Sequence, residues 1–598
     1  MKQIKTLILV FSLWTAVGML SKVLFLLFYH SLIPSLGAGD CLAVVWHGLL
    51  LDVAIAGYLS ILPGLMLAIS AWYAGAALQW LWRGYFALTA FVASLAYVSN
   101  LGLYAYWGFP LDGTPLLYIK TSPSAALASM AVWQLLLMPL IIIGVAVGIY
   151  KVMPRLPQRA KRGRIATGVA LVLLSATMII PIRGGFGTGT NHTGSVYFSP
   201  DIRLNHAAVN PIFCFVESVT HQEDIATRYR FMDGKEADAI FSAMTCTRLR
   251  PDAVRKDYNV VLICLESFSK YIMTEAGHVS GVTPNLDRYS REGIYFPNIY
   301  ASSFRTDRGL VSVLSGLPAQ PTMSVMDIPR ISTSLPSIAR TLVGDGYATH
   351  FYYGGDTNFS NMKSYIVGTG FQDVTAQYEF SPKLSTGKWG VADGPVYDRM
   401  LADIKEARQP FFKAFMTSSS HEPFDVPSYH KLDSPELNAF AYADHCLGVF
   451  VEQLKTLPCW KNTLVVIVPD HLGAYPAQAD NYQRWRYELP LVLLGGMITQ
   501  PHEVATVGSQ TDIAATVLAM LGRGHEDFLH SKDLLDPAAP HFAFFSVPDA
   551  MGMVEGDAFI YYDNTSKSVV TAEGTTPEAL LPKAKAYLQK LYDDLGAR

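Results

Sequence analysis

The chain has 598 residues, a formal net charge of −3 and 51% hydrophobic side chains. That length exceeds what one hydrophobic core usually serves, so two or more domains are expected. The net charge is uninformative about partners, and the chain has no basic tract that would suggest a nucleic-acid partner. Six scattered cysteines without a CxxC pair argue against a zinc knuckle or a dense disulfide framework.

Long apolar stretches dominate the N-terminal third of the chain. Five of them reach the ~20 residues that a membrane-spanning helix needs. They cover residues 7–28, 42–73, 85–104, 127–150 and 165–182. The first contains Lys22 and lacks a small-residue cleavage site, which favours a retained anchor over a signal peptide. The sequence therefore predicts a five-span transmembrane domain over residues 1–182.

Basic residues are distributed unevenly over the connections between these spans. Lys2, Lys5 and Arg83 lie on one side, where residues 151–164 add six more, whereas the loops on the other side contain only Lys120. By the positive-inside rule, the N-terminus is cytoplasmic. An odd number of spans then places everything after residue 182 outside.

Asp52 is an ionisable residue inside the second predicted span, which makes it a functional candidate by default. The alternative, favoured here, is a position near the outer interface or a partner within the bundle. After the spans, residues 183–215 are rich in Gly, Asn and Ser and are interpreted as an extended connector. A linker helix is expected in residues 221–244, so residues 183–257 form a juxtamembrane connector with linker helices.

From residue 258, short apolar runs alternate with helix-like segments. The strand-like runs are 259–267, 347–355, 410–419, 463–471 and 489–496, and helix-like segments lie at 334–346, 441–457 and 510–522. This alternation predicts an α/β domain over residues 258–540 with a mostly parallel sheet and helices on both faces. Residues 541–598 show alternating short strands and a final amphipathic helix, which indicates a small appended antiparallel sheet.

Charged residues follow three of these apolar runs directly. Glu266 follows the first run, His421 follows "FFKAFMT", and Asp470 and His471 follow "LVVIV". Sites in parallel sheets lie beyond the carboxyl ends of the strands, so these side chains are expected to meet at one edge. Two carboxylates and an imidazole suit a divalent cation such as manganese or zinc.

Thr306 opens a segment, "TDRGLVSVLSG", whose apolar spacing is helical. Its hydroxyl is expected at a helix N-terminus, where backbone amides and the helix dipole favour an anion. An ordinary N-cap role is the alternative on local sequence alone. Arg305 and Arg308 flank Thr306 and are candidates for a phosphate clamp, or for structural ion pairs.

Seven motifs of this half can be compared with a known family. They are "NVVLICLES", "VTPNLDRYSREGIYFPNIY", the following Thr, "YGGDTNFSN", "SSSHEPF", "PDHLGAYP" and "QTDIAATVLAMLG". In order and spacing, they resemble the motifs of the lipoteichoic acid synthase-like phosphoglycerol transferases of the alkaline phosphatase and sulfatase superfamily. A five-span anchor before an outward-facing catalytic domain is also similar to that family. The resemblance therefore covers almost the whole chain.

The resemblance implies a function and a set of roles. Glu266, Thr306, Asp470 and His471 would hold one divalent metal, typically Mn²⁺, with Mg²⁺ or Zn²⁺ as alternatives. Thr306 would be the nucleophile, and His421 would line the phosphate site, either as acid and base or as an orienting hydrogen-bond partner. The donor would be a phospholipid and the acceptor an envelope glycan or glycolipid, at a bacterial cytoplasmic (inner) membrane with the catalytic domain periplasmic or extracellular.

Two features depart from the family. The synthases carry a Trp and an Arg after the glycine-rich stretch, where this chain offers Phe359, Ser360, Met362 and Lys363 and has neither. Substrate-binding residues expected here are Asp356, Asn361 and Lys363, with Trp389 as a nearby aromatic platform or a packing residue. The segment "SFRTDRG" also lacks the C/S-x-P-x-R context of sulfatases, which disfavours sulfate ester hydrolysis.

Other functions stay open. The same site could transfer phosphoethanolamine, although six scattered cysteines fit those enzymes less well. With water as acceptor it would be a phosphodiesterase or phosphatase. A catalytically silent envelope scaffold is disfavoured by the complete set Glu266, Thr306, Asp470 and His471.

Overall fold

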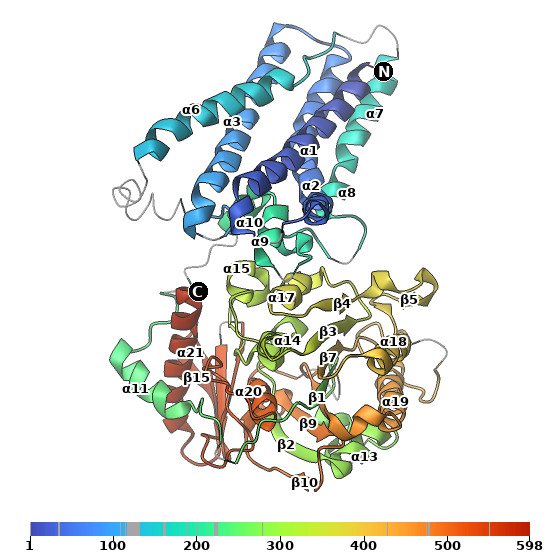
Figure 1. Cartoon of the computed structure of the whole chain (residues 1–598), viewed down its shortest axis with the longest axis vertical. Helices are drawn as coiled ribbons and strands as arrows, with labels where there is room; N and C mark the ends of the chain where they lie inside the picture. The colour runs from blue at the N-terminus through green and yellow to red at the C-terminus, as the bar shows by residue number, and fades with distance from the viewer. Residues whose placement is uncertain are drawn as a thin grey trace. The chain divides into compact units, whose positions relative to one another are not determined.

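The computed structural model describes residues 2–598 apart from a few short gaps. The gaps are 34–35, 108, 114, 116–131, 159–162, 188, 200, 221–224, 226, 251, 278, 427–428, 474, 476–478 and 549. The chain divides into two compact units, Met1–Glu223 and Asp224–Arg598, shown in one view in Figure 1. Each unit is described by itself below.

The first unit is built from apolar helices. Its longer helices are α1 (Lys2–Phe28), α2 (Ala38–Ser70), α3 (Ala76–Trp107), α6 (Val132–Val152) and α7 (Arg164–Thr177). Within the described residues, four helices are long and apolar enough to cross a membrane, and α7 together with α8 (Ile179–Arg183) forms the last of them. The predicted span 127–150 starts outside the described residues, and its described part lies in α6, whose stretch Leu137–Val152 is a shorter apolar helix.

Asp52 forms a pair inside the helix bundle. Its Oδ1 lies 2.5 Å from Lys22 Nζ and accepts a hydrogen bond of 2.9 Å from Asn210 Nδ2. Both charged side chains are fully buried. Gly18 and Gly48 leave the room for them, because a Cβ at either position would overlap the pair. The interpretation of Asp52 as a residue paired within the bundle is confirmed.

The segment after the last span is not an extended connector. It contains α9 (Ile202–Ala208) and α10 (Pro211–Thr220), which belong to the first compact unit. Asp201 caps α9 by accepting from Arg203 N, and Asn210 Oδ1 accepts from Ile212 N at the start of α10. Polar residues that indicate a loop act here as helix caps. In the second unit, α11 (Gly234–Met244) covers the later part of the predicted linker helix.

The second unit contains a mixed, mostly parallel sheet, as predicted. Among the described residues its strand order is β10-β2-β9-β8-β1-β7-β3-β4, with β11 also paired to β2. The strands are β1 (Asn259–Leu265), β2 (Ile294–Tyr300), β3 (Ala348–Tyr353), β4 (Asp373–Thr375), β7 (Phe411–Met416), β8 (Thr463–Pro469), β9 (Glu488–Leu494), β10 (His502–Glu503) and β11 (Gly508–Ser509). Only β9 among them pairs antiparallel, to β2 and β8.

Both faces of this sheet are covered by apolar packing. In β1, Val260, Leu262 and Cys264 join one buried cluster, while Val261 and Ile263 join another. The covering helices are α12 (Thr274–Gly277), α13 (Pro284–Glu292), α14 (Thr306–Ser315), α15 (Pro329–Ser332), α16 (Ile338–Gly344), α17 (Met362–Gly368), α18 (Asp393–Glu406), α19 (Pro435–Lys455) and α20 (Asp512–Met520). Because both faces are buried, the strands are apolar throughout, and polar side chains gather at their ends.

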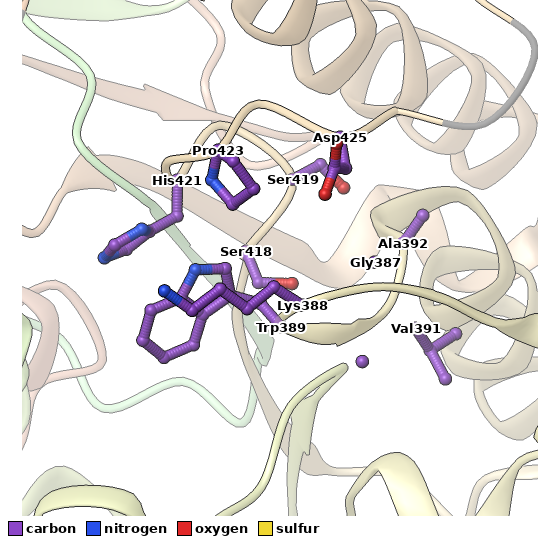
Figure 2. A pocket seen from close by; sticks show the side chains of 11 residues that line it. Gly387, Lys388, Trp389, Val391, Ala392, Ser418, Ser419, His421, Pro423 and Asp425 are labelled. Atoms are coloured by element: carbon purple, nitrogen blue, oxygen red, sulfur yellow. The ribbon is translucent and has the colours of Figure 1, made fainter. Parts of the chain in front are cut away.

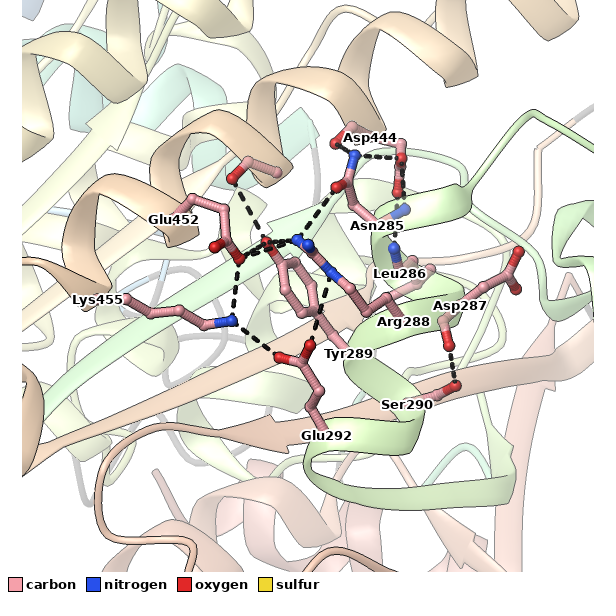
Figure 3. Close-up of polar contacts among 11 residues, drawn as sticks. Asn285, Leu286, Asp287, Arg288, Tyr289, Ser290, Glu292, Asp444, Glu452 and Lys455 are labelled. Atoms are coloured by element: carbon pink, nitrogen blue, oxygen red, sulfur yellow. Dashed lines mark hydrogen bonds and ion pairs between the residues drawn. The ribbon is translucent and has the colours of Figure 1, made fainter.

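A polar network fixes α13 against α19 (Figure 3). The buried carboxylate of Asp444 accepts from the backbone amides of Asn285 and Leu286, at 3.0 and 2.8 Å, and so caps α13. At the other end of α13, Arg288 donates to Glu452 at 2.9 Å, and Lys455 joins the same group. The motif "TPNLDRYSREG" therefore has a structural role, because it locks the helix that leads into β2.

The chain ends in a separate antiparallel sheet, as predicted. Its order is β12-β13-β14-β15, formed by Ala543–Val547, Ala550–Glu555, Ala558–Asp563 and Ser568–Glu573. The amphipathic helix α21 (Leu580–Ala597) packs on β13 and β14. A short hairpin of β5 (Ser385–Gly387) and β6 (Gly390–Val391) lies elsewhere in this unit and carries Trp389 at its turn.

Candidate active site

The central feature of the site is a pair of neighbouring strand ends. Strands β1 and β8 are parallel, and their register pairs Leu265 with Pro469. The next residues, Glu266 and Asp470, therefore leave the sheet side by side at its carboxyl edge, with His471 following. The buried apolar strand β8 ends in Asp470 and His471 because the neighbouring strand β1 ends in Glu266, which faces them.

Glu266, Asp470 and His471 form a compact cluster of potential metal ligands. One ligand atom from each lies within 4.8 Å of the others. His471 Nε2 is 3.4 Å from Asp470 Oδ2 and 3.8 Å from Glu266 Oε1. All three residues are buried or nearly so. The convergence that the sequence predicted for these three residues is present.

Hydrogen bonds orient each member of the cluster. Asp470 Oδ1 accepts from the backbone amides of Ser267 and His471, both at 2.8 Å, and Ser267 Oγ donates to Glu266 Oε1 at 2.6 Å. His471 Nδ1 lies 3.0 Å from the carbonyl oxygen of Leu472. That contact fixes the proton on Nδ1 and leaves the Nε2 lone pair directed at the carboxylates.

The electrostatics of the cluster favour a cation between these groups. Burial, reinforced by the charge of Glu266, raises the pKa of Asp470 to about 7. Burial lowers the pKa of His471, but the carboxylates of Asp470 and Glu266 outweigh it and the net shift is upward. Asp470 Oδ2 is buried without a hydrogen-bond partner among the described residues. An unsatisfied buried carboxylate oxygen, a second carboxylate and an imidazole lone pair fit a divalent ion.

Thr306 joins the cluster from a different element. It is the first residue of α14, and the cap position before it is Arg305, so Thr306 is not the N-cap. Its hydroxyl donates to Glu266 Oε2 at 3.3 Å and lies 3.5 Å from His471 Nε2. Gly309 permits this approach, because a Cβ there would lie 2.3 Å from the carbonyl oxygen of Asp470. The helix start thus presents a half-buried hydroxyl to the three ligands.

His421 lines a pocket together with Trp389 and Ser418 (Figure 2). Its Nδ1 is 2.9 Å from the carbonyl oxygen of Glu422, which leaves Nε2 as an acceptor. Burial lowers its pKa, so the neutral ring is favoured near pH 7. The indole of Trp389 lies against it, with ring centres 4.2 Å apart, and Trp389 Nε1 donates to Glu422 O at 2.6 Å. Phe359 meets the other side of the indole edge-on at 5.4 Å.

Sequence reasoning missed the residues that position this loop. Asp393, at the start of α18, accepts from the backbone amides of Ser418 and Ser419 at 2.8 and 3.2 Å. Burial raises the pKa of Asp393 to about 6. Ser267 was also missed, and it adopts a left-handed backbone with φ of 60°. A polar residue directly after an apolar run was a signal for Ser267, but nothing local indicated Asp393.

The flanking arginines are placed differently. Arg305 is exposed, with its guanidinium 6.0 Å from the ring centre of Phe304. Arg308 donates to the carbonyl oxygen of Met323 at 3.2 Å, and its Nε is buried without a partner among the described residues. A phosphate-clamp role for Arg305 and Arg308 stays a prediction.

Asp356, Asn361 and Lys363 lie together after β3. Asp356 Oδ1 accepts from the backbone and side-chain amides of Asn358, at 2.9 and 3.0 Å. Asn361 donates to Met326 O at 2.7 Å and accepts from Ser364, so its side chain holds the loop. Burial lowers the pKa of Lys363, with Glu379 and Asp356 opposing that shift. Substrate binding by these three residues stays a prediction.

Comparisons with known proteins agree with this architecture. Residues 258–523 match the family model described as Sulfatase. A lipoteichoic acid synthase-like protein, YvgJ, of Bacillus subtilis (strain 168) is 23% identical over 64% of this chain and 66% of its own length. Phosphoglycerol transferase I of Xanthomonas campestris pv. campestris (strain B100) is 27% identical over 48% of this chain and 44% of its own length. The chain thus spans about half to two thirds of these relatives.

Two solved structures share the fold. A protein of the alkaline phosphatase superfamily from Vibrio parahaemolyticus has a TM-score of 0.54 and 26% identity, covering 61% of this chain and 97% of that one. The lipoteichoic acid synthase LtaP from Listeria monocytogenes has a TM-score of 0.51 and 19% identity, covering 61% and 99%. The predicted resemblance and the alkaline phosphatase-like fold are confirmed, and residues 258–523 are similar to the Sulfatase family.

Proposed function

We propose that this membrane protein, whose second unit carries a sulfatase-family domain, transfers a phosphoglycerol-type head group from a phospholipid to an envelope glycan or glycolipid. The observation that carries the proposal is the Thr306 hydroxyl at the start of α14, directed at Glu266 and His471. Nucleophile and ligands come from three separate elements, which is typical of a built catalytic site. The names of the relatives support the phosphoglycerol class of reaction.

The proposed metal ligands are Glu266, Asp470, His471 and Thr306. The donor set contains two carboxylates, one imidazole lone pair and one hydroxyl, which suits Mn²⁺, with Mg²⁺ or Zn²⁺ as alternatives. When bound, such an ion lowers the pKa of a coordinated hydroxyl and neutralises charge on a phosphoryl oxygen. The buried, unsatisfied oxygen of Asp470 supports the assignment.

In the first half-reaction, Thr306 Oγ1 attacks the phosphorus of the donor lipid. A bond forms between Thr306 Oγ1 and phosphorus, and the bond from phosphorus to the diacylglycerol oxygen breaks. Glu266 Oε2 accepts the hydroxyl proton of Thr306, to which it is already hydrogen-bonded. A proton then reaches the departing diacylglycerol oxygen, and protonated His421 is the proposed donor.

In the second half-reaction, a hydroxyl of the acceptor attacks the phosphothreonine. His421 takes the proton of that hydroxyl through Nε2, which the contact between Nδ1 and Glu422 O leaves free. Thr306 leaves and regains its proton, so the enzyme returns to its starting state. The lowered pKa of His421 favours the neutral ring that this step requires. An orienting role for His421 without proton transfer is the alternative.

Substrate contacts are proposed for the basic residues around Thr306. Arg305 is exposed beside the nucleophile, and Arg308 has a buried, unpartnered Nε among the described residues. Both are suited to a phosphate, and Lys363 with Asp356 and Asn361 would complete the pocket. The segment Phe359 to Lys363 lacks the Trp and Arg of the family, which leaves phosphoethanolamine as the second candidate head group.

The test uses purified full-length protein in detergent with Mn²⁺ and one labelled lipid at a time. We expect diacylglycerol release from phosphatidylglycerol, a much slower release from phosphatidylethanolamine, and loss of both on chelation. A preference for phosphatidylethanolamine would contradict the head group. Free glycerol phosphate formed at the same rate with and without a glycolipid acceptor would indicate a hydrolase instead.

The orientation belongs to the same proposal. The basic residues at 2–5, 83 and 151–164 support a cytoplasmic N-terminus and a catalytic domain on the outer side of a bacterial cytoplasmic membrane. Envelope glycans are available only on that side.

A further inference from the structure

The membrane unit contains an apolar groove that the catalytic site does not use. Its volume is about 390 Å³, and it is lined by α1, α3, α6 and the residues around α9. Figure 1 shows α6 lying away from α1 along α3, and α6 packs on α3 while α1 packs on α2. The groove therefore lies between two helices that do not cover each other.

The polar groups in its wall are already satisfied inside the protein. Lys22 pairs with Asp52, His206 Nδ1 lies 3.0 Å from Tyr104 OH, and Asn100 Oδ1 accepts from Leu111 N at 2.8 Å. The rest of the lining is mainly aliphatic and aromatic. Apolar cavities without free polar partners do not hold ordered water, and they bind apolar ligands.

The rim of the groove is continuous with the lipid-facing surface. Leu20, Leu24 and Phe28 on α1 are 56%, 47% and 59% exposed, and Ile141 and Val145 on α6 are 47% and 38% exposed. All five residues line the groove, and they belong to α1, a candidate membrane span, and to α6, a shorter apolar helix. What reaches such a rim in a bilayer is hydrocarbon.

We propose that this groove binds one acyl chain of a diacyl phospholipid. Its volume has room for about a dozen groups of the size of a water molecule, at about 30 Å³ each, which is comparable to most of one acyl chain. Because lipid tails are as apolar as the groove wall, what would hold the chain is van der Waals packing against the wall and not transfer out of water. The proposal does not depend on the chemistry of the catalytic site.

The chain offers matched pairs of substitutions. Val145→Trp and Leu24→Trp place an indole in the groove from opposite walls. Ile143→Trp on α6 and Leu27→Trp on α1 add the same side chain at positions 54% and 66% exposed that do not line it. Because the two filling variants lie on different helices, a folding defect in one leaves the other informative.

The experiment uses full-length protein in phosphatidylcholine vesicles with a phospholipid that carries a diazirine near the end of one acyl chain. We expect saturable photolabelling of α1 and α6 peptides, at least fivefold weaker in both filling variants and unchanged in both controls. Phosphatidylglycerol and phosphatidylethanolamine probes should label alike, because Lys22 and His206, among the described residues of the wall, are paired within the protein. Equal labelling of all four variants would overturn the proposal. So would an efficient disulfide between two chains of Val145→Cys, which would place a second copy in the groove.

Discussion

At the scale of single residues, the site depends on a few side chains whose surroundings give them their roles. Asp470 is buried, faces a second carboxylate and has an oxygen without a partner among the described residues. Leaving such a group uncompensated is costly, so a bound cation should stabilise the fold. Thr306 is directed to the same place by the start of α14.

Removing one carboxylate should remove the metal. In Asp470→Asn the shape is kept and the charge is lost, so we expect less than one tenth of the wild-type metal content after dialysis. Mn²⁺ at 100 times its dissociation constant should stabilise the wild-type protein by about 2.7 kcal/mol, but not the variant. Metal analysis and thermal unfolding measure these effects, with Asp425→Asn, an exposed carboxylate at the pocket, as control. An Asp470→Asn protein that retains stoichiometric metal would refute the ligand assignment.

Substituting His421 should slow both half-reactions. We expect His421→Gln to lower turnover about 100-fold or more, because the diacylglycerol oxygen loses its acid and the acceptor hydroxyl loses its base. With saturating metal, the wild-type rate should fall with acid only below the ordinary histidine pKa of about 6.5, since burial lowers that of His421. The variant should lack this acid limb. A pH–rate profile that is identical in both proteins would favour the orienting role.

At the scale of elements, the sequence predicted what depends on local pattern. The apolar runs of β1, β3, β7, β8 and β9 were recognised, and parallel strands placed Glu266 and Asp470 at one edge. Strand β2 was missed because Pro297 interrupts its run, and the structure accommodates it with a register shift between Phe296 and Ile299. The contacts of Asp393 and Trp389 with the His421 loop join segments distant in sequence, so no local pattern could reveal them.

The packing of α14 on the end of β8 should be sensitive to one methyl group. A Cβ at Gly309 would lie 2.3 Å from Asp470 O, so Gly309→Ala must displace the helix that carries Thr306. We expect a loss of about 1–3 kcal/mol in stability and a fall in turnover of tenfold or more. Gly344→Ala at the end of α16 meets nothing within 4 Å and should change neither. Denaturant unfolding and lipid turnover are measured for both variants. If Gly309→Ala is as stable and as active as Gly344→Ala, α14 has room to adjust and the prediction is wrong.

At the scale of the whole molecule, the chain contains an apolar helical unit and a second unit whose residues 258–523 match the Sulfatase family model. The sequence predicted the unit's long apolar helices, because their length and composition are local properties. It did not predict α9 and α10, whose caps are formed by the same polar residues that favour loops. The sequence also did not predict Lys22 as the partner of Asp52, because the two residues lie on different helices.

The topology can be tested by fusion. A reporter that is active only in the cytoplasm should stay silent after Arg598, and the same reporter placed before Lys2 should be active. Both results are expected because the basic residues gather in the connections on the side of the N-terminus, and the positive-inside rule places that side in the cytoplasm. A bright signal from the C-terminal fusion would contradict the proposed orientation, and with it access to an envelope acceptor.

The most direct test of the account is the mass of the Thr306 peptide during turnover. Full-length protein incubated with phosphatidylglycerol and Mn²⁺, without acceptor, should gain one phosphoglycerol group on that peptide, and adding a glycolipid acceptor should remove it. Thr306→Ser should still form the adduct at a reduced rate, whereas Thr306→Ala should form none and release no diacylglycerol. A Thr306→Ala protein that releases diacylglycerol at the wild-type rate would contradict the central claim that Thr306 is the nucleophile.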